Sequence, residues 1–418
     1  MKVLIKNATI ISSSPHNGQS SDILIDNGII AEIKQNINGA VDKIIEADGL
    51  HISAGWMDCF ANFCDPGDEY KETLKTGANA AAAGGFTEVM LIPNTTPVAD
   101  NKSQVEYIVQ SGRQLPATLH SIGAVTKNAE GKELSEMYDM HSTGAVAFSD
   151  GINSLQSSGV LLKALQYVSA FDGTIIQMPD DKNIGTHGLM NEGITSTWLG
   201  LPGKPAIAEE LSIARDIELA KYTKSKIHFT GISTKKSLQL ITKAKEDSLH
   251  VTCSVTPYHV FFCDEDLATY DTNLKVNPPL RTREDMLALR DGLKSGLIDC
   301  IASHHQPQDW DCKTCEFEYA KNGMTGLESL FGVISICEIN TNDFVKMQSE
   351  NSRKIFGITI PEIKEGARAN LTLFIPDVKY VFTEEYIYSK SKNNAFIGKE
   401  LRGKIIGIIN GDKVFLNK

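Results

Sequence analysis

Residues 53–67 read S-A-G-W-M-D-C-F-A-N-F-C-D-P-G, and the rest of the chain is organised around this stretch. Its short apolar run, closed by a Pro-Gly pair, is typical of a buried strand that ends in a turn. The two-residue period of a strand would place Asp58, Phe60 and Asn62 on one face. We therefore predict a buried strand whose alternate side chains all point in one direction.

The composition favours a large globular protein that does not bind nucleic acid. The chain has 418 residues, of which 41% are hydrophobic, and its formal net charge is −11. Phosphate binding needs a basic face, and no dense run of Lys or Arg is present. No apolar stretch reaches the roughly 18 residues of a membrane helix, and the N-terminus alternates like a strand without a signal-peptide core. We expect a cytoplasmic protein whose partners are proteins or small molecules, with no nucleic acid and no membrane.

The eight cysteines are expected to be free thiols. Cys59, Cys253 and Cys300 stand singly inside apolar runs, where cysteine acts as a small buried hydrophobe of a reducing compartment. Cys312 and Cys315 form a C-x-x-C that could bind zinc or act as a redox pair. No second C-x-x-C is present to complete a four-ligand site.

Both ends of the chain carry short alternating segments typical of β-hairpins. An Asn-Gly pair at residues 27–28 and another at 410–411 are two-residue turn signals between such segments. We predict that residues 1–52 and 358–418 pair into one small, composite β-sandwich domain.

Between these ends, strands and helices alternate, which predicts βα units and a parallel sheet. The predicted strands end near Asn62, Asn94, Ala124, Asp150, Met178, Gly231, Thr256 and Ser303. The helical stretches that follow include residues 72–83, 104–110, 155–169, 209–222, 235–244 and 284–293. Eight units fit an α/β fold, the (β/α)8 TIM barrel, over residues 53–357, with its chemistry at the carboxyl ends of the strands.

The first predicted strand resembles the motif Asp-x-His-x-His-x-Arg-(Asp/Glu)-Pro-Gly that opens the metal site of the dihydroorotases. These enzymes are a branch of the amidohydrolase superfamily, and the resemblance, to the class I or multifunctional-complex type, covers about residues 1–415. It implies a barrel whose strand ends hold two zinc ions, a bridging hydroxide and an acid-base Asp. Phe60 and Asn62 stand here at the two histidine positions, and Cys64 stands at the arginine.

The other metal positions that the resemblance implies are also substituted. After the fourth strand Asp150 is the carboxylate that remains, Gln177 replaces the histidine of the fifth strand, and Gly231 replaces that of the sixth. His304 stands at the catalytic Asp. His228 is expected to face the helices, because its parity is opposite to that of position 231.

Without a metal to lower the pKa of bound water from about 15.7 to about 7, such a site forfeits roughly 12 kcal/mol in forming hydroxide. We therefore expect no cofactor. A single stray divalent ion held by Asp150 and the His304-His305 pair is a weaker alternative. Phe60 is expected to be buried and to fill the vacated space beside Gly231, since volume-conserving exchanges are tolerated best.

The motifs around this site are retained in the sequence. They are I-P-N-T-T-P (92–97), N-E-G (191–193), G-L-P-G-K-P (200–205), K-V-N-P-P-L-R (275–281) and G-L-E (326–328). The resemblance implies substrate contacts at Asn62, Cys64, Asn94, Asn277, Gln308, Asn322 and Gly323, with Gln308 replacing a histidine. Pro, Gly and Asn also fix turns whether or not anything binds. Asp180-Asp181 and Asp264-Glu265-Asp266 are expected to be solvated loop charges rather than acid-base pairs.

Three hypotheses about function follow. The leading one is an inactive dihydroorotase homologue, a pseudoenzyme of de novo pyrimidine biosynthesis that binds aspartate transcarbamoylase, the partner that the resemblance implies. Its alternative is an active dihydroorotase or related cyclic-amide hydrolase that uses a rearranged metal site to convert dihydroorotate to N-carbamoyl-aspartate. The second alternative is a structural homo-oligomer, such as a homodimer.

Overall fold

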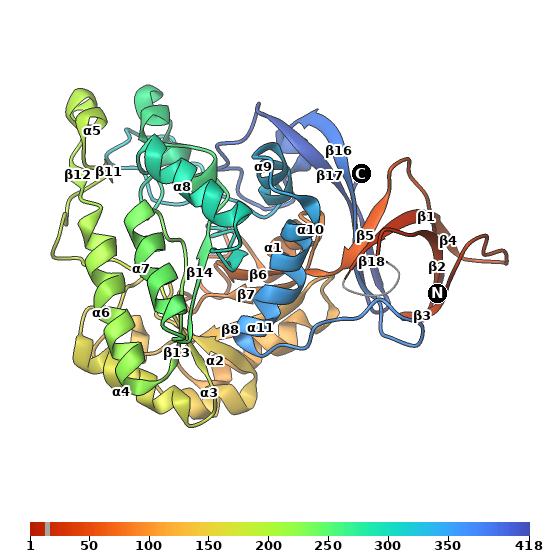
Figure 1. Ribbon diagram of the computed structural model, residues 1–418, viewed down its shortest axis with the longest axis horizontal. Coiled ribbons are helices and arrows are strands. Elements are labelled where there is room, and N and C mark those ends of the chain that lie inside the picture. Colours follow the sequence, from red (N-terminus) through yellow and green to blue (C-terminus); the bar gives the residue numbers. More distant parts are fainter. Residues whose placement is uncertain (13–16) are drawn as a thin grey trace.

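The computed structural model of the protein describes residues 1–12 and 17–418. Eight parallel strands form one sheet that curves into a barrel (Figure 1). In spatial order they are β6 (Trp56–Ala61), β7 (Phe86–Leu91), β8 (Thr118–Gly123), β9 (Ala145–Phe148), β10 (Thr174–Gln177), β13 (Lys226–Phe229), β14 (Val251–Val255) and β15 (Cys300–Ile301). The α/β barrel predicted from the alternating pattern is confirmed.

Helices cover the outside of the barrel, as Figure 1 shows for α4, α6, α7 and α8. The helices between strands are α1 (Leu74–Ala83), α2 (Lys102–Ser111), α3 (Met137–Thr143), α4 (Ser158–Ser169), α6 (Ile207–Thr223), α7 (Lys235–Glu246) and α8 (Arg283–Lys294). Their apolar stripes follow the helical period. In α7, Leu238, Ile241 and Ala244 are buried and join the core that contains Phe229 of β13. Thr234 caps this helix by accepting a hydrogen bond from the backbone N–H of Ser237.

The barrel closes along a seam between β6 and the chain that follows β15. Backbone pairing across this seam is sparse: Ala61 and His305 form a single parallel bridge, and Asn62 N donates to His305 O at 2.8 Å. A side chain supplements it, since Asp58 accepts hydrogen bonds from the Ser303 N–H and from the Ser303 hydroxyl, both at 2.7 Å. Closure of the barrel therefore depends on the buried Asp58 carboxylate as well as on backbone hydrogen bonds.

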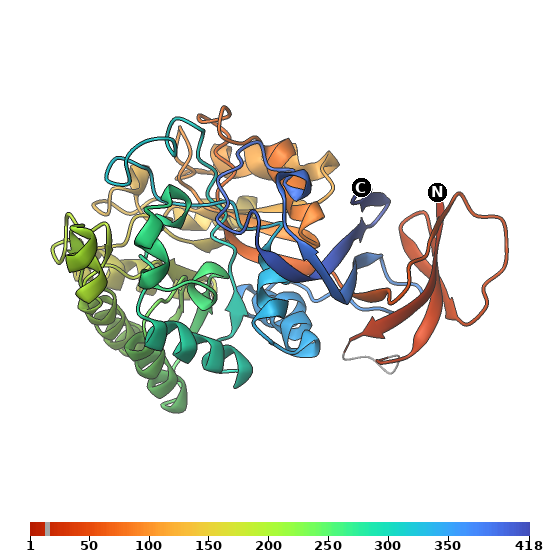
Figure 2. The same cartoon turned by 90° about the horizontal axis from the view of Figure 1, so that it is seen from above.

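The two ends of the chain share a second sheet beside the barrel (Figure 2). Its strands are β1 (Lys2–Ile11), β2 (Ser20–Asp26), β3 (Ile29–Lys34), β4 (Lys43–Ile45), β5 (His51–Ala54), β16 (Asn370–Val381), β17 (Glu400–Asn410) and β18 (Lys413–Leu416). β5 pairs parallel with β1 and antiparallel with β16, which joins the two termini. Both predicted hairpin turns form, with positive φ at Asn27, Gly28 and Gly411. The domain boundaries at 52/53 and 357/358 stay predictions.

A buried arginine joins the barrel to the second sheet. Arg353 lies in α11 (Ser352–Phe356) and is fully buried. It donates to Gly55 O at 2.7 Å and to Glu88 Oε1 of β7 at 2.9 Å. The same carboxylate accepts hydrogen bonds from Asn370 of β16, at 3.0 Å, and contacts His120 Nε2 at 2.8 Å.

The remaining helical elements of the described chain are shorter. They are α5 (Ile194–Leu199), α9 (Leu330–Ile336), α10 (Thr341–Val345), the π-helix η6 (Lys346–Asn351) and the 3-10 turns η1 (Gly112–Gln114), η2 (Lys127–Ala129), η3 (Tyr258–Val260), η4 (Asp264–Thr269), η5 (Thr272–Leu274) and η7 (Glu384–Tyr386). The short strands β11 (Met190–Asn191) and β12 (Gly203–Lys204) form a separate pair. Within residues 1–12 and 17–418, none of the helices combines the length and apolar character needed to span a bilayer.

Candidate functional site

The carboxyl ends of the strands meet at the barrel mouth, and His304 occupies its centre. The imidazole is buried, Phe60 lies against it with ring centroids 4.5 Å apart, and its Nε2 is 2.7 Å from Thr230 Oγ1. Burial lowers the pKa of His304 to about 3, and the nearby His259 and His228 act in the same direction. His304 is therefore a neutral, packed side chain.

Gly231 provides the space that this imidazole fills. Its φ is +66°, and a Cβ built there would lie 2.5 Å from His304 Cε1. The predicted burial of Phe60 is confirmed, whereas its packing beside Gly231 stays a prediction. The three atoms nearest to the missing Cβ all belong to His304, whose own backbone is left-handed, with φ of +44°. The substituted Asp position, rather than the substituted His position, fills the gap.

Replacing Gly231 by Ala should lower the free energy of unfolding by about 2–4 kcal/mol, because the new methyl group meets an imidazole that is held on two sides. Gly357→Ala is the matched control, since Gly357 has the same left-handed φ, +67°, and no atom lies within 4 Å of the place that its new methyl group would take. It isolates the backbone cost of about 1 kcal/mol. Urea unfolding of both variants measures the difference, and equal losses would contradict the packing of His304 over Gly231.

Little space remains in the mouth. The cavity there has a volume of about 10 Å³ and is lined by Phe60, Asn62, Met178, Asn277 and His304, among others. That volume suits roughly one water molecule, whereas ligand pockets span about 300–1,000 Å³. In this conformation the mouth is closed to a ring-sized substrate.

Two of the predicted metal positions do not contribute to the mouth. Asp150 accepts hydrogen bonds from the Thr126 N–H at 2.9 Å and from the Thr126 hydroxyl at 2.5 Å. Burial raises the pKa of Asp150, and these bonds offset part of that effect. Gln177 donates to Asp216 Oδ2 of α6 at 3.0 Å, so it faces the helices. Its predicted place in the mouth is wrong because Ile176 points inward and strand neighbours alternate.

The neighbouring histidine turns away from His304. His305 accepts at Nδ1 from the Gly326 N–H, at 3.2 Å, and its Nε2 lies 3.5 Å from Glu72 Oε2. His304, His305 and Asp150 therefore each have hydrogen-bond partners elsewhere in the protein and do not face one another. This arrangement does not support the single stray-ion alternative.

The implied substrate positions near β6 and β7 bind parts of the protein itself. Asn94 donates to Asp150 O at 3.1 Å and accepts from the Ile152 N–H at 3.0 Å. Asn62 Oδ1 accepts from the Cys64 N–H at 2.8 Å, and burial raises the pKa of the Cys64 thiol to about 12. Their roles as substrate contacts stay predictions.

The later substrate positions are likewise paired. Gln308 donates to Asn322 O at 2.8 Å, and the Gly323 N–H donates to Lys275 O at 2.9 Å. Asn277 Oδ1 accepts from Lys204 Nζ at 3.0 Å. These bonds fix the loops around the mouth.

Three of the retained motifs converge on one network that sequence reasoning missed. Lys204, from G-L-P-G-K-P, also binds Asp180 Oδ2 at 2.8 Å, so the expectation that Asp180 is a solvated loop charge is wrong. Arg281, from K-V-N-P-P-L-R, is buried and donates to Asn191 Oδ1 of N-E-G at 3.1 Å. Asn191 in turn donates to the buried Asp264 at 2.9 Å, which corrects the same expectation there. The three motifs were visible in the sequence, but nothing in the sequence showed that they meet in space.

Comparison with known proteins identifies the family. A family model described as "Dihydro-orotase-like" matches residues 51–237. A protein named dihydroorotase from Carboxydothermus hydrogenoformans is 40% identical over 409 residues, which covers 96% of this chain and 95% of that protein. Another, from Caldicellulosiruptor saccharolyticus, is 40% identical over 420 residues and covers 99% and 98%. The chain belongs to the dihydroorotase family.

Solved structures show the same fold at lower identity. The L-hydantoinase (dihydropyrimidinase) from Arthrobacter aurescens has a TM-score of 0.88 and 22% identity, covering 100% of this dihydroorotase-family chain and 96% of the other. A D-hydantoinase structure has a TM-score of 0.84 and 19% identity, with coverage of 100% and 96%. These likenesses support the barrel and its accompanying sheet.

The mouth of this dihydroorotase-family barrel does not fit the two-zinc centre that the resemblance implies. Zinc needs imidazole, thiolate or carboxylate donors at several strand ends at once. Here a phenyl ring and a glycine occupy two of these positions, at Phe60 and Gly231, and Gln177 faces away. The donors of His304 and Asp150 are engaged by Thr230 and Thr126.

The expectation that the chain needs no cofactor is nevertheless wrong. Its relatives are named dihydroorotases, and the resemblance associates that family with zinc. Cys59, His228 and Cys300 also place three potential metal-ligand atoms within 4.8 Å of one another. The prediction that His228 faces the helices is wrong as well. β13 ends at Phe229 and Gly231 is left-handed, so strand parity cannot be counted back from position 231.

The C-x-x-C pair lies elsewhere. Cys312 and Cys315 are half-buried, and the Cys315 thiol lies 3.8 Å from Cys312 O. They belong to no group of three donors in the described ranges 1–12 and 17–418.

Proposed function

We propose that this chain works at the dihydroorotate step of de novo pyrimidine biosynthesis, as a binding and assembly protein for aspartate transcarbamoylase rather than as a hydrolase. The name of its relatives supports the pathway step. One observation carries the non-hydrolytic role: the His304 imidazole fills the mouth between Phe60 and Gly231. Neither space for the substrate ring nor donors for a hydroxide-forming pair of metals remain there.

Hydrolysis of dihydroorotate by a rearranged site is the second candidate. The relatives at 40% identity carry the name dihydroorotase, and this favours the hydrolase over an inactive chain. The two candidate functions require different conformations of the barrel mouth. Hydrolysis requires His304 to swing away and expose a new donor set, whereas assembly requires only that the barrel surface persist.

Exposed aromatic side chains in the segments that follow the strand ends support an assembly role. Trp198 is 85% exposed in α5, which follows β11 in the segment between β10 and β13, and Trp310 and Tyr319 are 74% and 70% exposed in the loop after β15. Large aromatic side chains are enriched at the centres of protein interfaces. The identity of the partner comes from the family resemblance. A stable complex should bury at least about 1,000 Å².

Turnover of dihydroorotate by the zinc-supplied protein should equal that of its own His304→Ala variant, because neither can form a metal-bound hydroxide at the mouth. Hydrolysis is followed by the loss of dihydroorotate absorbance, with Cys253→Ala as the control for general damage. Turnover that chelator abolishes, that Cys253→Ala keeps and that His304→Ala raises would establish the hydrolase instead.

The assembly role predicts a complex with aspartate transcarbamoylase of the same organism on size exclusion at micromolar concentration. Trp198→Ser should weaken it by about tenfold or more, because loss of a buried aromatic anchor costs roughly 2 kcal/mol. Tyr222→Ser is the matched control: Tyr222 is exposed at the far end of α6, about 22 Å from Ile207, the first residue of that helix. Separate migration of the two proteins, or a homodimer lost in Trp198→Ser, would overturn the proposal.

A further inference from the structure

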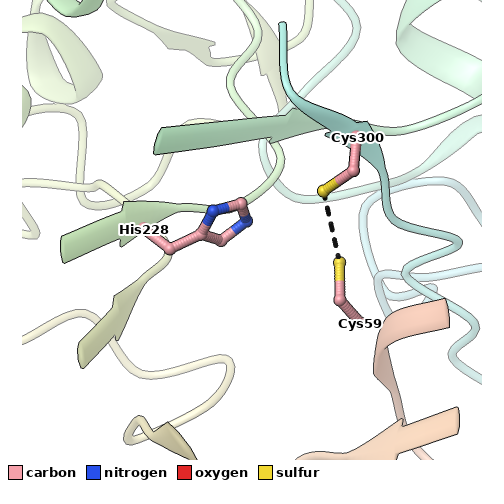
Figure 3. A group of neighbouring side chains, drawn as sticks. All are labelled: Cys59, His228 and Cys300. Atoms are coloured by element: carbon pink, nitrogen blue, oxygen red, sulfur yellow. Dashed lines mark hydrogen bonds between the residues drawn. The ribbon is translucent and has the colours of Figure 1, made fainter. Parts of the chain in front are cut away.

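A cluster of soft metal donors lies inside the barrel, on strands β6, β13 and β15 (Figure 3). Cys59 Sγ and Cys300 Sγ are 3.8 Å apart, and a ring nitrogen of His228 faces the two sulfurs. All three side chains are at most 1% exposed. None of the three stands at a position where the family resemblance places a metal ligand.

The distance between the sulfurs matches a shared metal ion. Two thiolates bound tetrahedrally to zinc at about 2.3 Å are separated by about 3.8 Å. A disulfide would require the sulfurs to approach to about 2.05 Å. The observed spacing of 3.8 Å agrees with the first arrangement without movement of either strand.

The surroundings of His228 also suit a metal ligand. Its two ring nitrogens lie 2.9 Å from Thr252 Oγ1 and 3.1 Å from Ser254 Oγ. A metal ion would replace one of these two hydrogen bonds, and the other would remain and fix the orientation and tautomer of the imidazole.

Charge balance selects the metal. The cluster is surrounded by apolar side chains of the barrel interior, including Met57, Met90 and Ile176. Two thiolates, one neutral imidazole and Zn²⁺ sum to zero charge, whereas Cu⁺ with the same ligands leaves an uncompensated negative charge. A net charge in such surroundings is strongly disfavoured.

We propose that Cys59, His228 and Cys300 bind one zinc ion and that this ion fastens the barrel seam. β6 and β15 are the first and last strands of the barrel, and their direct backbone pairing is sparse. An ion shared by Cys59 and Cys300 links them across the seam, and His228 ties them to β13. None of the three ligands lines the mouth, although Ser254 and Thr230 connect His228 to His304 by hydrogen bonds.

The test is elemental analysis of full-length protein produced in zinc-supplemented medium and purified without chelator. About one equivalent of zinc per chain is expected, falling at least several-fold in Cys59→Ser and Cys300→Ser. Cys253→Ser is the matched control: Cys253 is equally buried on β14 but packs in the outer core, and its variant should keep the metal. Cobalt substitution adds a second readout, a thiolate-to-cobalt charge-transfer band that both ligand variants lose.

If the variants fail to fold, a measurement on the wild-type protein tests the proposal instead. Denaturation in the presence of a zinc indicator should release the metal and make Cys59 and Cys300 newly reactive to alkylation. Zinc-free protein with free thiols, a Cys59–Cys300 disulfide found by mass spectrometry, or zinc that persists in Cys59→Ser would each overturn the proposal.

Discussion

Replacing Arg353 by Met lowers the free energy of unfolding by about 3–5 kcal/mol, because it leaves a carboxylate buried without its cation. Glu88, 8% exposed, then keeps Asn370 and His120 as its partners. The carbonyl groups of Gly55 and Ser349 also lose the donor that binds them at 2.7 Å and 2.6 Å. Urea unfolding of wild type and variant measures the loss.

The double variant Arg353→Met/Glu88→Gln separates these contributions. Removing both charges should recover about half of the loss, since the isolated charge is the costly element. Lys379→Met, which breaks the exposed Lys379–Glu400 pair, is the surface control and should cost less than about 1 kcal/mol. A loss of that size for Arg353→Met would contradict the bridging role.

The same carboxylate gives stability a dependence on acid pH. Burial alone would raise the pKa of Glu88. The His120 hydrogen bond and the Arg353 charge outweigh burial and lower this pKa from 4.5 to about 2. Because the folded pKa is the lower one, the stabilisation is complete above about pH 4.5. It is lost as pH falls toward 2, by about 3 kcal/mol in total.

Asp58 at the barrel seam should give stability the opposite pH dependence, so that the protein loses stability as pH rises. Burial raises its pKa from 3.8 to about 6, although the hydrogen bonds from Ser303 lower it in part. The folded state therefore holds this proton more tightly than the unfolded state. The corresponding stability is complete below about pH 3.8 and falls by about 3 kcal/mol as pH rises to 6.

Two substitutions isolate this effect at the seam. Asp58→Asn keeps an acceptor for the Ser303 N–H and a donor for the Ser303 hydroxyl, so it should be at least as stable as wild type at pH 7. It should also abolish the change between pH 3.8 and 6. Asp58→Ala loses both bonds and should cost about 2–4 kcal/mol at pH 7. Thermal unfolding across this pH range checks both, and a wild-type profile retained in Asp58→Asn would contradict the assignment.

The fold was predictable because its signals are local. Alternation of strand and helix patterns specifies βα units, and the Asn27-Gly28 turn specifies a hairpin by its positive φ values. The joining of both termini by β5 and β16 depends on pairing between distant segments, and only the shared β character of the two ends pointed to it.

The site was less predictable, because side-chain direction near a strand end depends on where the regular strand stops. Gln177 points outward by regular alternation with Ile176, whereas the parity of His228 could not be counted back from Gly231, because β13 ends at Phe229 and Gly231 is left-handed. The meeting of Asn191, Lys204 and Arg281 depends on loops that no local pattern specifies. Cys59 and Cys300 were correctly predicted as buried free thiols, but their proximity follows from barrel closure.

The sheet built from both termini has a consequence for synthesis on the ribosome. Trp56 N donates to Thr372 Oγ1, 316 residues further along the chain, and β5 lies directly before it. At about 5–20 residues per second, translation of the intervening barrel takes roughly 15–60 s. Throughout that interval the edge of β5 has no β16 to pair with. The nascent chain therefore carries an open strand edge for longer than most small domains need to fold.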